Sequence, residues 1–443
     1  MSHKNHRIAA ALALTLGAMS PCAHAQLAGA PPAGALPGLG ALPAGLAVPR
    51  AEQDPAQRLL QEQRDRQRRD EIAQPPAQIA VPEQPAMPDL PPGADVDTLP
   101  DVAPTFLIER IEFTGDAILG QHELDRIAAP FIGRQLGRNR INLLLRRLTE
   151  AFIARGYITT RAYLGPQNLA SGTLKINLVP GRVAALTLNG KPLRPRDPDE
   201  KWYEVRGGGW LTEAGTAWAF ASTPGDVLRL PDLEQGVDQI NRLRRNQAEI
   251  RILPGEAPGD SIVAISNRYG DRLHYDFGID NYGSAQTGKT RYRAGVEADN
   301  VIGLQESLSF SYVGTTDTNA LVFSAAVPYG YQTFSYTASM SEYQQTIGDV
   351  ALLAGRTFSQ MLGWNDVLVR SPRGRMSVDV TLNKLRTERD VNGIPLSPQN
   401  LTVLRVALNG LSRFVMRDQG AAATWDIGVS QGLPWLAANH DAS

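Results

Sequence analysis

Apolar and polar positions recur with two different periods along this chain. From residue 141 to 152, apolar side chains recur every three or four positions, which predicts an amphipathic helix. Gly156 follows at the position where a glycine commonly ends a helix. From residue 173 to 178, polar and apolar residues alternate strictly, which predicts a strand with one buried and one solvated face. Together they predict a small α/β module with an exposed strand edge and no catalytic side chains.

The same patterns predict two consecutive α/β modules. In the first, residues 105–182, a strand through Leu107, Ile111 and Phe113 precedes two helices and two further strands, in the order β-α-α-β-β. The second module, residues 183–267, repeats this plan. Its predicted elements are a strand at 183–188, a helix at 231–244 and strands at 248–253 and 261–266.

After Asn267 the period changes to two. Strands of about ten residues, with apolar side chains on one face and charged or hydroxyl side chains on the other, predict the wall of an antiparallel transmembrane β-barrel over residues 268–443. A soluble β-sandwich alternates in the same way. Strand length favours the barrel, and so do aromatic residues near strand ends, which are typical of membrane interfaces. These aromatic residues are Tyr282, Tyr329, Tyr331, Trp364 and Trp435.

The N-terminal region has the features of an exported protein. Basic residues, an apolar run and the small residues before Gln26 predict a signal peptide over residues 1–25. The one cysteine, Cys22, lies within that segment. We therefore expect a mature chain without disulfides, thiol nucleophiles or cysteine metal sites. Residues 26–50 are a low-complexity leader, and residues 75–104 are a proline-rich linker.

A polar helix is predicted over residues 51–74, between the leader and the linker. Asp54 is its expected N-cap and Pro55 its first helical residue. Since it is polar nearly all round, it cannot lie in an apolar core. Two interpretations remain: a solvated helix, or a plug lying in the watery lumen of a barrel. The candidate plug residues are Arg58, Glu62, Arg66 and Arg69.

Composition and motifs exclude several function classes. A formal net charge of −1 argues against a nucleic-acid protein. Outside the predicted signal the histidines are far apart, and the chain has no nucleophile elbow, phosphate loop or zinc-protease motif. We therefore predict no enzyme activity, catalytic residue, cofactor, metal site or small-molecule substrate.

Several local motifs, in a fixed order, resemble the ShlB/FhaC/HecB family of two-partner secretion transporters. They are GYITTRAYL with the turn PGRV, LRLPDLEQGVDQINRL, LPGEAPGDS, the segment from Phe277 to Tyr312, VPYGY and SQGLPW. The resemblance implies a plug helix, two periplasmic POTRA domains and a sixteen-stranded outer-membrane barrel surrounded by lipid. It also implies export of one large β-helical partner of the haemolysin or adhesin type. Barrel assembly and a general porin are the alternatives.

In that family the POTRA domains capture the unfolded partner in the periplasm. The physical basis we expect is β-augmentation, in which an exposed strand edge pairs with an extended backbone. The candidate partner-binding residues in the first POTRA domain are Tyr157, Thr159, Arg161, Tyr163, Lys175 and Asn177.

The chain departs from the family pattern in two places. It ends at Ser443, before the expected Val-Arg-Gly-aromatic motif, and about nine strands are counted where the family has sixteen. We expect either a fragment or a truncated gene. The Val-Arg-Gly tripeptide at 205–207 precedes the barrel and is interpreted as unrelated. The second departure is a Trp- and Gly-rich insertion around residues 202–218, to which the sequence assigns no role.

Overall fold

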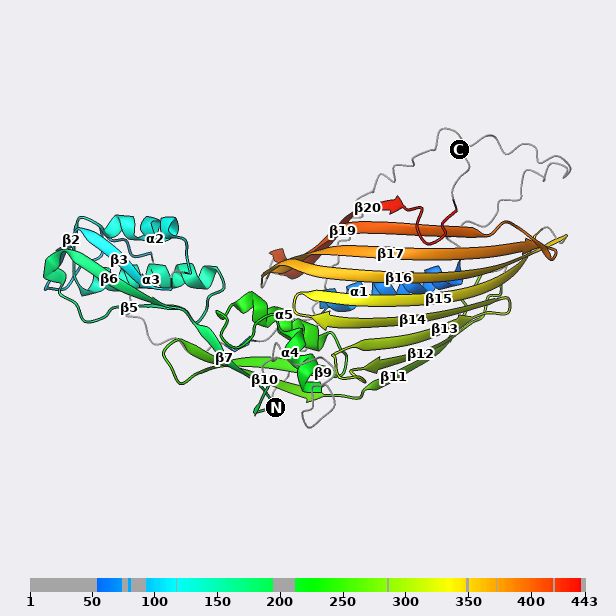
Figure 1. The fold of residues 1–443 in the computed structure, drawn as a ribbon, viewed down its shortest axis with the longest axis horizontal. Helices are drawn as coiled ribbons and strands as arrows, with labels where there is room; N and C mark the ends of the chain where they lie inside the picture. Colours follow the sequence, from blue (N-terminus) through cyan, green and yellow to red (C-terminus); the bar gives the residue numbers. More distant parts are fainter. Residues whose placement is uncertain are drawn as a thin grey trace, which may run out of the picture. The chain divides into compact units, whose positions relative to one another are not determined.

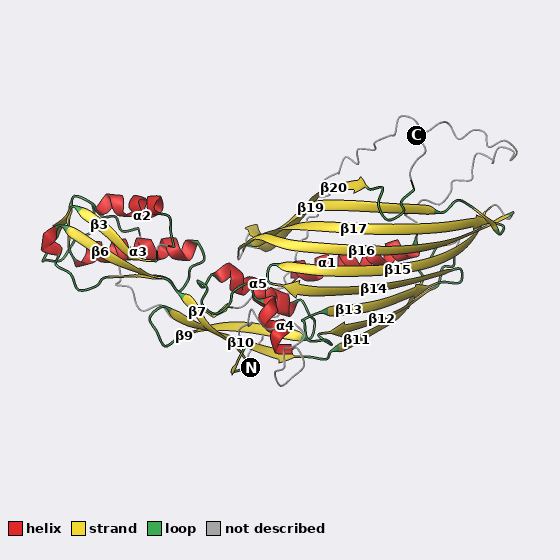
Figure 2. Ribbon diagram, viewed as in Figure 1, coloured by secondary structure: helices red, strands yellow, loops and turns green. Residues whose placement is uncertain are grey.

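The computed structural model describes residues 54–73, 79–80, 93–116, 118–193, 212–284, 287–347, 350–371, 373–416 and 419–439. The expected signal peptide, the leader and most of the linker and of the insertion lie outside these residues. The chain divides into two compact units, one α/β and one dominated by a large sheet. Figures 1 and 2 show their elements.

The first α/β module has the predicted element order with two differences. A short strand, β4, lies between its two helices, and its first predicted strand is divided into β2 and β3. Its sheet has the order β3-β6-β5, and a separate pair joins β2 to β4. The strand expected through Leu107 and Phe113 is two strands, because the N–H groups of Glu109 and Arg110 both donate to the carbonyl of Gly172 and turn the chain. The elements are β2 (Phe106–Ile108), β3 (Arg110–Gly115), α2 (Gln121–Ala128), β4 (Arg134–Leu136), α3 (Arg138–Ala154), β5 (Arg161–Tyr163) and β6 (Thr173–Val179).

Helix α3 ends as its sequence predicts. Gly156 has φ 89°, a left-handed conformation that a residue with a Cβ adopts only with strain. The N–H of Tyr157 donates to the carbonyl of Phe152 at 2.9 Å, and that of Gly156 donates to Ile153 at 2.9 Å. These two bonds form a Schellman motif. A Cβ on Gly156 would lie 2.8 Å from Cδ of Pro231, so close packing against the second module also requires glycine here.

The second module packs helix α5 on a five-stranded sheet with the order β1-β9-β10-β7-β8. Its core joins the inward faces of the strands to Leu233, Val237 and Ile240 of the helix. Ile158, which belongs to the first module in sequence, is buried in this same core. The elements are β1 (Ile79–Ala80), β7 (Arg182–Leu188), β8 (Lys191–Pro192), α4 (Thr212–Ala219), α5 (Leu230–Asn241), β9 (Asn246–Pro254) and β10 (Asp260–Tyr269).

The second unit is built on one large antiparallel sheet. Its strands follow in chain order from β11 to β20, and the short β18 (Ile394–Pro395) pairs only with β17. Among the described residues β11 and β20 do not pair with each other, so the sheet is open. Its nine successive strands agree with the count from sequence. They are β11 (Leu273–Asp280), β12 (Arg291–Asp299), β13 (Ser307–Gly314), β14 (Thr318–Tyr329), β15 (Gln332–Ile347), β16 (Ala351–Ser371), β17 (Gly374–Val391), β19 (Gln399–Met416) and β20 (Gln419–Gly432).

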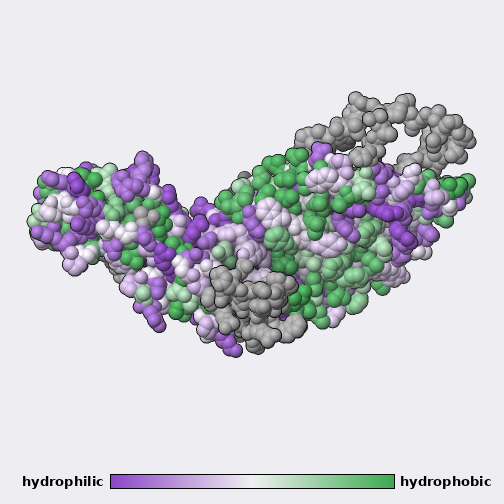
Figure 3. Space-filling view, viewed as in Figure 1, coloured by the Kyte–Doolittle hydropathy of each residue, from purple (hydrophilic) through white to green (hydrophobic). Residues whose placement is uncertain are grey.

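The two faces of this sheet differ as the alternation predicts. One face presents large apolar side chains to the outside, among them Phe310, Leu362 at 58% exposure and Ile427 at 68%. Figure 3 shows apolar surface extending over these strands. The opposite, inner face carries small or polar residues, including the buried Ser341 and Ser359. An exposed apolar face of this extent is typical of a sheet that meets lipid.

Among the described residues, no helix is both long and apolar enough to cross a bilayer.

Candidate functional site

Helix α1 (Pro55–Ala73) lies on the inner face of the large sheet, as Figure 1 shows in blue. It contacts β13, β14 and β15. Ala56 and Leu59 form a small apolar cluster with sheet residues that include Val313 and Val322. The helix therefore has one narrow apolar stripe, and its remaining surface is polar, as the sequence indicates. Such a helix suits a polar, water-accessible interior.

The N-terminus of α1 is fixed by one carboxylate with two partners. The Oδ1 atom of Asp54 accepts a bond from the N–H of Ala56 at 2.9 Å, so Asp54 is the predicted N-cap. The same atom accepts a bond from Oγ of Ser341 in β15 at 2.5 Å. Asp54 is buried, with 8% exposure. The residue that begins the helix therefore also attaches it to the sheet.

An ion-pair network holds the middle of α1. Oε1 of Glu62 lies 2.8 Å from Nη1 of Arg291 in β12. Asp280, directly opposite Arg291 on β11, binds the same guanidinium through Nε at 3.0 Å and Nη2 at 3.1 Å. Arg293 adds a second cation, 3.1 Å from Asp280. The bidentate hydrogen bonds to Asp280 fix the orientation of the Arg291 guanidinium. The Glu62 carboxylate therefore binds a guanidinium that is already oriented by the sheet.

Two further side chains connect α1 to the sheet, and the sequence did not single them out. Nε2 of Gln63 donates to Oγ of Ser311 at 2.9 Å, and Nη2 of Arg64 lies 3.3 Å from Sδ of Met361. Gln63 lies four positions after Leu59 and therefore on the same face of the helix. This spacing would have predicted from the sequence that Gln63 faces the sheet.

Of the four candidate plug residues, Glu62 meets the sheet through Arg291. Arg58, Arg66 and Arg69 are exposed. Nε of Arg69 donates to the backbone carbonyl of Asp65, one turn earlier on the same helix.

The six candidate partner-binding residues of the first module fall into two groups. Tyr163, Lys175 and Asn177 are exposed. Tyr163 lies opposite Asn177 across the β5–β6 pair, and Nζ of Lys175 lies 3.9 Å from Glu112 on β3. These residues form one solvated face of the sheet, which we call the open face: Glu112, Tyr163, Lys175 and Asn177.

The other three candidates lie where the first module meets the second. The guanidinium of Arg229 stands 5.9 Å above the ring of Tyr157. A Cβ on Gly181 would overlap Thr159, so these two residues are closely packed. Arg161 donates to the carbonyls of Ile158 and Thr160 at 2.8 Å, and burial lowers the pKa of its guanidinium.

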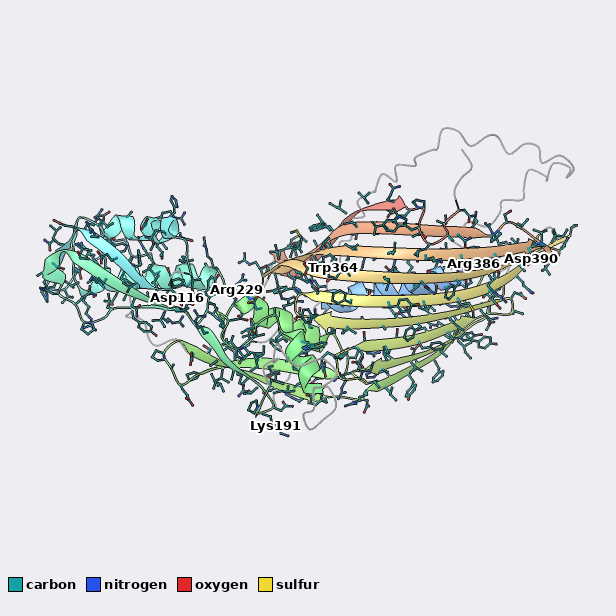
Figure 4. The ribbon with its side chains drawn as sticks, in the orientation of Figure 1. Asp116, Lys191, Arg229, Trp364, Arg386 and Asp390 are labelled. Carbon is teal, nitrogen blue, oxygen red and sulfur yellow. The ribbon has the colours of Figure 1, made fainter. Side chains whose placement is uncertain are left out.

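The joint between the two modules carries further contacts. Arg182 binds Asp116 at 2.7 Å, and the N–H of Leu230 donates to the carbonyl of Gly156 at 2.8 Å. Figure 4 labels Asp116 and Arg229 at this joint. Tyr157 and Thr159 therefore lie in contact at this joint, and Arg161 binds the loop that carries Ile158 into the second module's core, whereas the open face remains accessible.

Within the described ranges, no cluster of three His, Cys, Asp or Glu side chains could hold a metal ion. The open face instead offers a strand edge and polar side chains, and the contact between α1 and the large sheet is made of polar side chains and ion pairs.

Three family models match consecutive parts of the chain. Residues 106–181 match the POTRA domain of ShlB type, and residues 182–254 match a POTRA domain. Residues 259–443 match the haemolysin secretion/activation protein ShlB/FhaC/HecB. The boundary between the POTRA models, at residue 181, coincides with the turn between β6 and β7.

Curated relatives and a solved structure agree with these matches. The outer membrane transporter CdiB-2 of Burkholderia pseudomallei (strain 1026b) is 30% identical over 403 residues, covering 85% of this chain and 64% of the relative. The hemolysin transporter protein ShlB of Serratia marcescens is 27% identical over 354 residues, covering 78% of this chain and 59% of the relative. The structure of CdiB from Escherichia coli superposes with a TM-score of 0.71 at 27% identity, covering 88% of this chain and 68% of that one. The chain thus spans less than two thirds of the length of these curated relatives.

Proposed function

Because this chain belongs to the ShlB/FhaC/HecB family of haemolysin secretion/activation proteins, we propose that it moves a large secreted partner protein across the outer membrane in two-partner secretion. One observation carries the proposal. Two POTRA domains are followed by a sheet with an apolar outer face, and a polar helix lies against the inner face of that sheet. The protein is located in the outer membrane of a Gram-negative bacterium, with its POTRA domains in the periplasm.

In this proposal the open face of the first POTRA domain captures the partner as an extended chain. Extended backbone pairs with a sheet edge, and side chains beside that edge select which segment binds. Tyr163 stands on β5, which is an edge strand of its sheet, next to Asn177 on the central strand. The partner we propose is a β-helical protein of the haemolysin or adhesin type, since the relative ShlB is a hemolysin transporter.

Helix α1 acts as the plug of the pathway. Its attachments are individually modest: one buried carboxylate, one ion-pair network and two side-chain contacts. Hydrogen bonds and partly exposed ion pairs of this kind contribute about 1 kcal/mol each. Together they can keep α1 against the inner face of the sheet and still allow its release. The role is non-catalytic, because transport of this kind needs binding and displacement rather than bond chemistry.

Secretion of the partner tests the proposal. The gene is expressed in its host together with a candidate partner, a large secreted protein, and that partner is measured in the medium. Deletion of residues 106–181 should abolish secretion and leave membrane insertion unchanged. Continued secretion after this deletion would refute the capture role. A barrel-assembly role would instead appear as a loss of unrelated outer-membrane proteins when the gene is removed.

A further inference from the structure

The tip of the turn between β12 and β13 is part of the α/β unit. Residues Ile302–Gln305 are grouped with that unit, although the two strands that flank them belong to the sheet unit. Gln305 is fully buried at 0% exposure, whereas Val301 at the start of the same turn is 49% exposed. Turns usually lie on the surface, so complete burial of a glutamine in one requires partners for its amide.

Three residues of the second POTRA domain bind Gln305. Its Nε2 atom donates to Oγ1 of Thr216 in α4 at 3.1 Å, and its Oε1 atom accepts a bond from Nδ2 of Asn246 at 3.0 Å. Its backbone carbonyl accepts a bond from Nη2 of Arg242 at 2.7 Å. Both ends of the side-chain amide are therefore bound inside the α/β unit.

The bonds continue from Gln305 through three asparagines. Nδ2 of Asn267 in β10 donates to Oδ1 of Asn246 at 3.2 Å. The backbone N–H of Asn267 donates to Oδ1 of Asn189 at 2.9 Å, and its carbonyl accepts a bond from Nδ2 of Asn189 at 3.1 Å. We call Thr216, Gln305, Asn246, Asn267 and Asn189 the amide network. Because each member is bound by the next, removing one leaves its neighbours without a partner in a buried place.

The backbone around Gln305 is also constrained. Gln305 has φ 56°, a left-handed conformation that glycine adopts at less cost than glutamine. A Cβ on Gly215 of α4 would lie 2.1 Å from the carbonyl oxygen of Gly303, so α4 and the turn approach this closely only because Gly215 has no side chain. An unfavourable backbone conformation persists where the surrounding contacts fix it. Here those contacts are the amide bonds of Gln305 and the close approach of α4.

The chain connections show what the network adds. After the linker, the chain passes between the two units at Gly270, at Val301 and at Gln305. The N–H of Gly270 donates to the carbonyl of Arg245 at 2.6 Å, and Arg245 directly precedes Asn246 of the network. A connection through a glycine alone permits rotation, because glycine accepts a wide range of φ. A turn bound in the amide network removes this freedom, since rotation about Gly270 would pull Gln305 away from Thr216 and Asn246.

We propose that Gln305 is a positioning residue, which fixes the orientation of the second POTRA domain by holding the β12–β13 turn in the amide network. The proposal rests on the proposed function, because a captured partner enters the pathway only from a domain that keeps one orientation. Gln305 acts through that orientation and not by contact with the partner. Without its side chain, the domain remains attached through the backbone but rotates about Gly270.

The test measures the spread of distances between the two units in the purified full chain. Cys22→Ser makes two engineered cysteines unique, and Glu256→Cys in the β9–β10 turn and Arg373→Cys in the β16–β17 turn place spin labels at exposed positions. Gln305→Gly keeps the left-handed backbone and removes the amide. We expect it to broaden the distance distribution, measured by pulsed electron paramagnetic resonance, by about twofold, because the domain then samples several orientations. An unchanged width would overturn the proposal.

Matched variants separate the amide from the flexibility of the turn. Val301→Gly adds a glycine at the exposed start of the turn and should leave the distribution narrow. Gly215→Ala moves α4 away from the turn and should broaden the distribution although Gln305 is intact. Gln305→Asn keeps an amide and tolerates positive φ, so it should restore part of the narrow width. Equal broadening in Val301→Gly and Gln305→Gly would overturn the role of the amide.

Partner secretion is the second readout, and Gln305→Gly should reduce it several-fold while membrane insertion stays unchanged. The distance measurement uses no partner, so the two proposals fail in different ways. If the native chain secretes no partner but Gln305→Gly still broadens the distances, the proposed function is refuted and the positioning of the domain is supported. If Gln305→Gly broadens the distances and secretion is undiminished, a fixed orientation is not needed and the positioning role in secretion is refuted.

Discussion

Glu62 of helix α1 and Arg291 of strand β12 are bound at 2.8 Å although 229 residues separate them in sequence. Arg291 is 14% exposed and already bound through two nitrogens by Asp280, so it does not have to be ordered when Glu62 arrives. Glu62 itself is 38% exposed, which leaves its half of the pair partly screened by water. An ion pair of this kind favours binding of α1 to the sheet but is weak enough for the helix to dissociate.

Replacing Glu62 by Gln should weaken the hold on α1. The ion pair is partly exposed, so its loss is worth about 0.5–1 kcal/mol, which corresponds to a roughly two- to fivefold higher released fraction. A Leu59→Cys variant measures this fraction by its rate of maleimide labelling, because Leu59 is buried against the sheet. Arg66→Gln, on an exposed position of the same helix, is the matched control and should leave labelling unchanged. If raising the salt concentration increases labelling equally in the native protein and in Glu62→Gln, the ion pair does not hold the helix.

Asp54 should contribute more than Glu62, because one oxygen both caps the helix and binds Ser341. Asp54→Ala removes the two bonds and should destabilise the first turn of α1 by about 1–2 kcal/mol, measured as faster amide exchange in residues 56–60. Ser341→Ala removes only the attachment and keeps the cap. It should therefore release the helix without unwinding its first turn. Equal exchange in the two variants would contradict this separation of roles.

Gly156 should be intolerant of a side chain. Its φ of 89° and the 2.8 Å approach of Pro231 to a Cβ mean that Gly156→Ala is strained at both the helix end and the module joint. We expect a loss of about 1–3 kcal/mol in the free energy of unfolding, measured by thermal or urea denaturation. Gly165→Ala is the control, since a Cβ there meets open space and its φ is not positive. A stable Gly156→Ala protein would show that the joint can shift.

The two tyrosines among the candidate partner-binding residues should behave differently. Tyr163 is exposed on the open face, so Tyr163→Ala should reduce partner secretion several-fold and leave thermal stability unchanged. Tyr157 lies beneath Arg229 at the joint, so Tyr157→Ala should lower the stability of the α/β unit. Secretion and thermal unfolding are measured for both variants. Undiminished secretion in Tyr163→Ala would remove the open face as the capture site.

Neighbouring residues on β13 allow the lipid-facing assignment to be tested. Phe310 is exposed on the apolar face, whereas Ser309 lies on the opposite, inner face. Phe310→Arg should cost about 2–4 kcal/mol of stability in lipid vesicles if the position lies near the bilayer centre. Ser309→Arg should cost much less because its charge faces a polar interior. Similar losses of vesicle insertion for both variants would show that this face does not meet lipid.

Local patterns determined most of the secondary structure. The alternation in β6, the Gly156 helix end, the Asp54 cap and the two-faced strands after Asn267 each depend on near neighbours in sequence, so the sequence alone predicts them. The break between β2 and β3 was missed because it depends on Gly172, which is far away in sequence and accepts bonds from Glu109 and Arg110.

Tertiary structure alone decided which surfaces are available for function. Tyr157 and Tyr163 lie six positions apart and are alike in chemistry, yet one is covered by Arg229 and the other is exposed. The polar character of α1 indicated a water-accessible environment, but only the fold shows that Glu62 meets Arg291 of a strand distant in sequence. The pairing of β1 with β9 has no local signal, since a strand of two residues defines no period. Period and capping are properties of adjacent residues, whereas contact between distant strands and helices is fixed only when the whole sheet has formed.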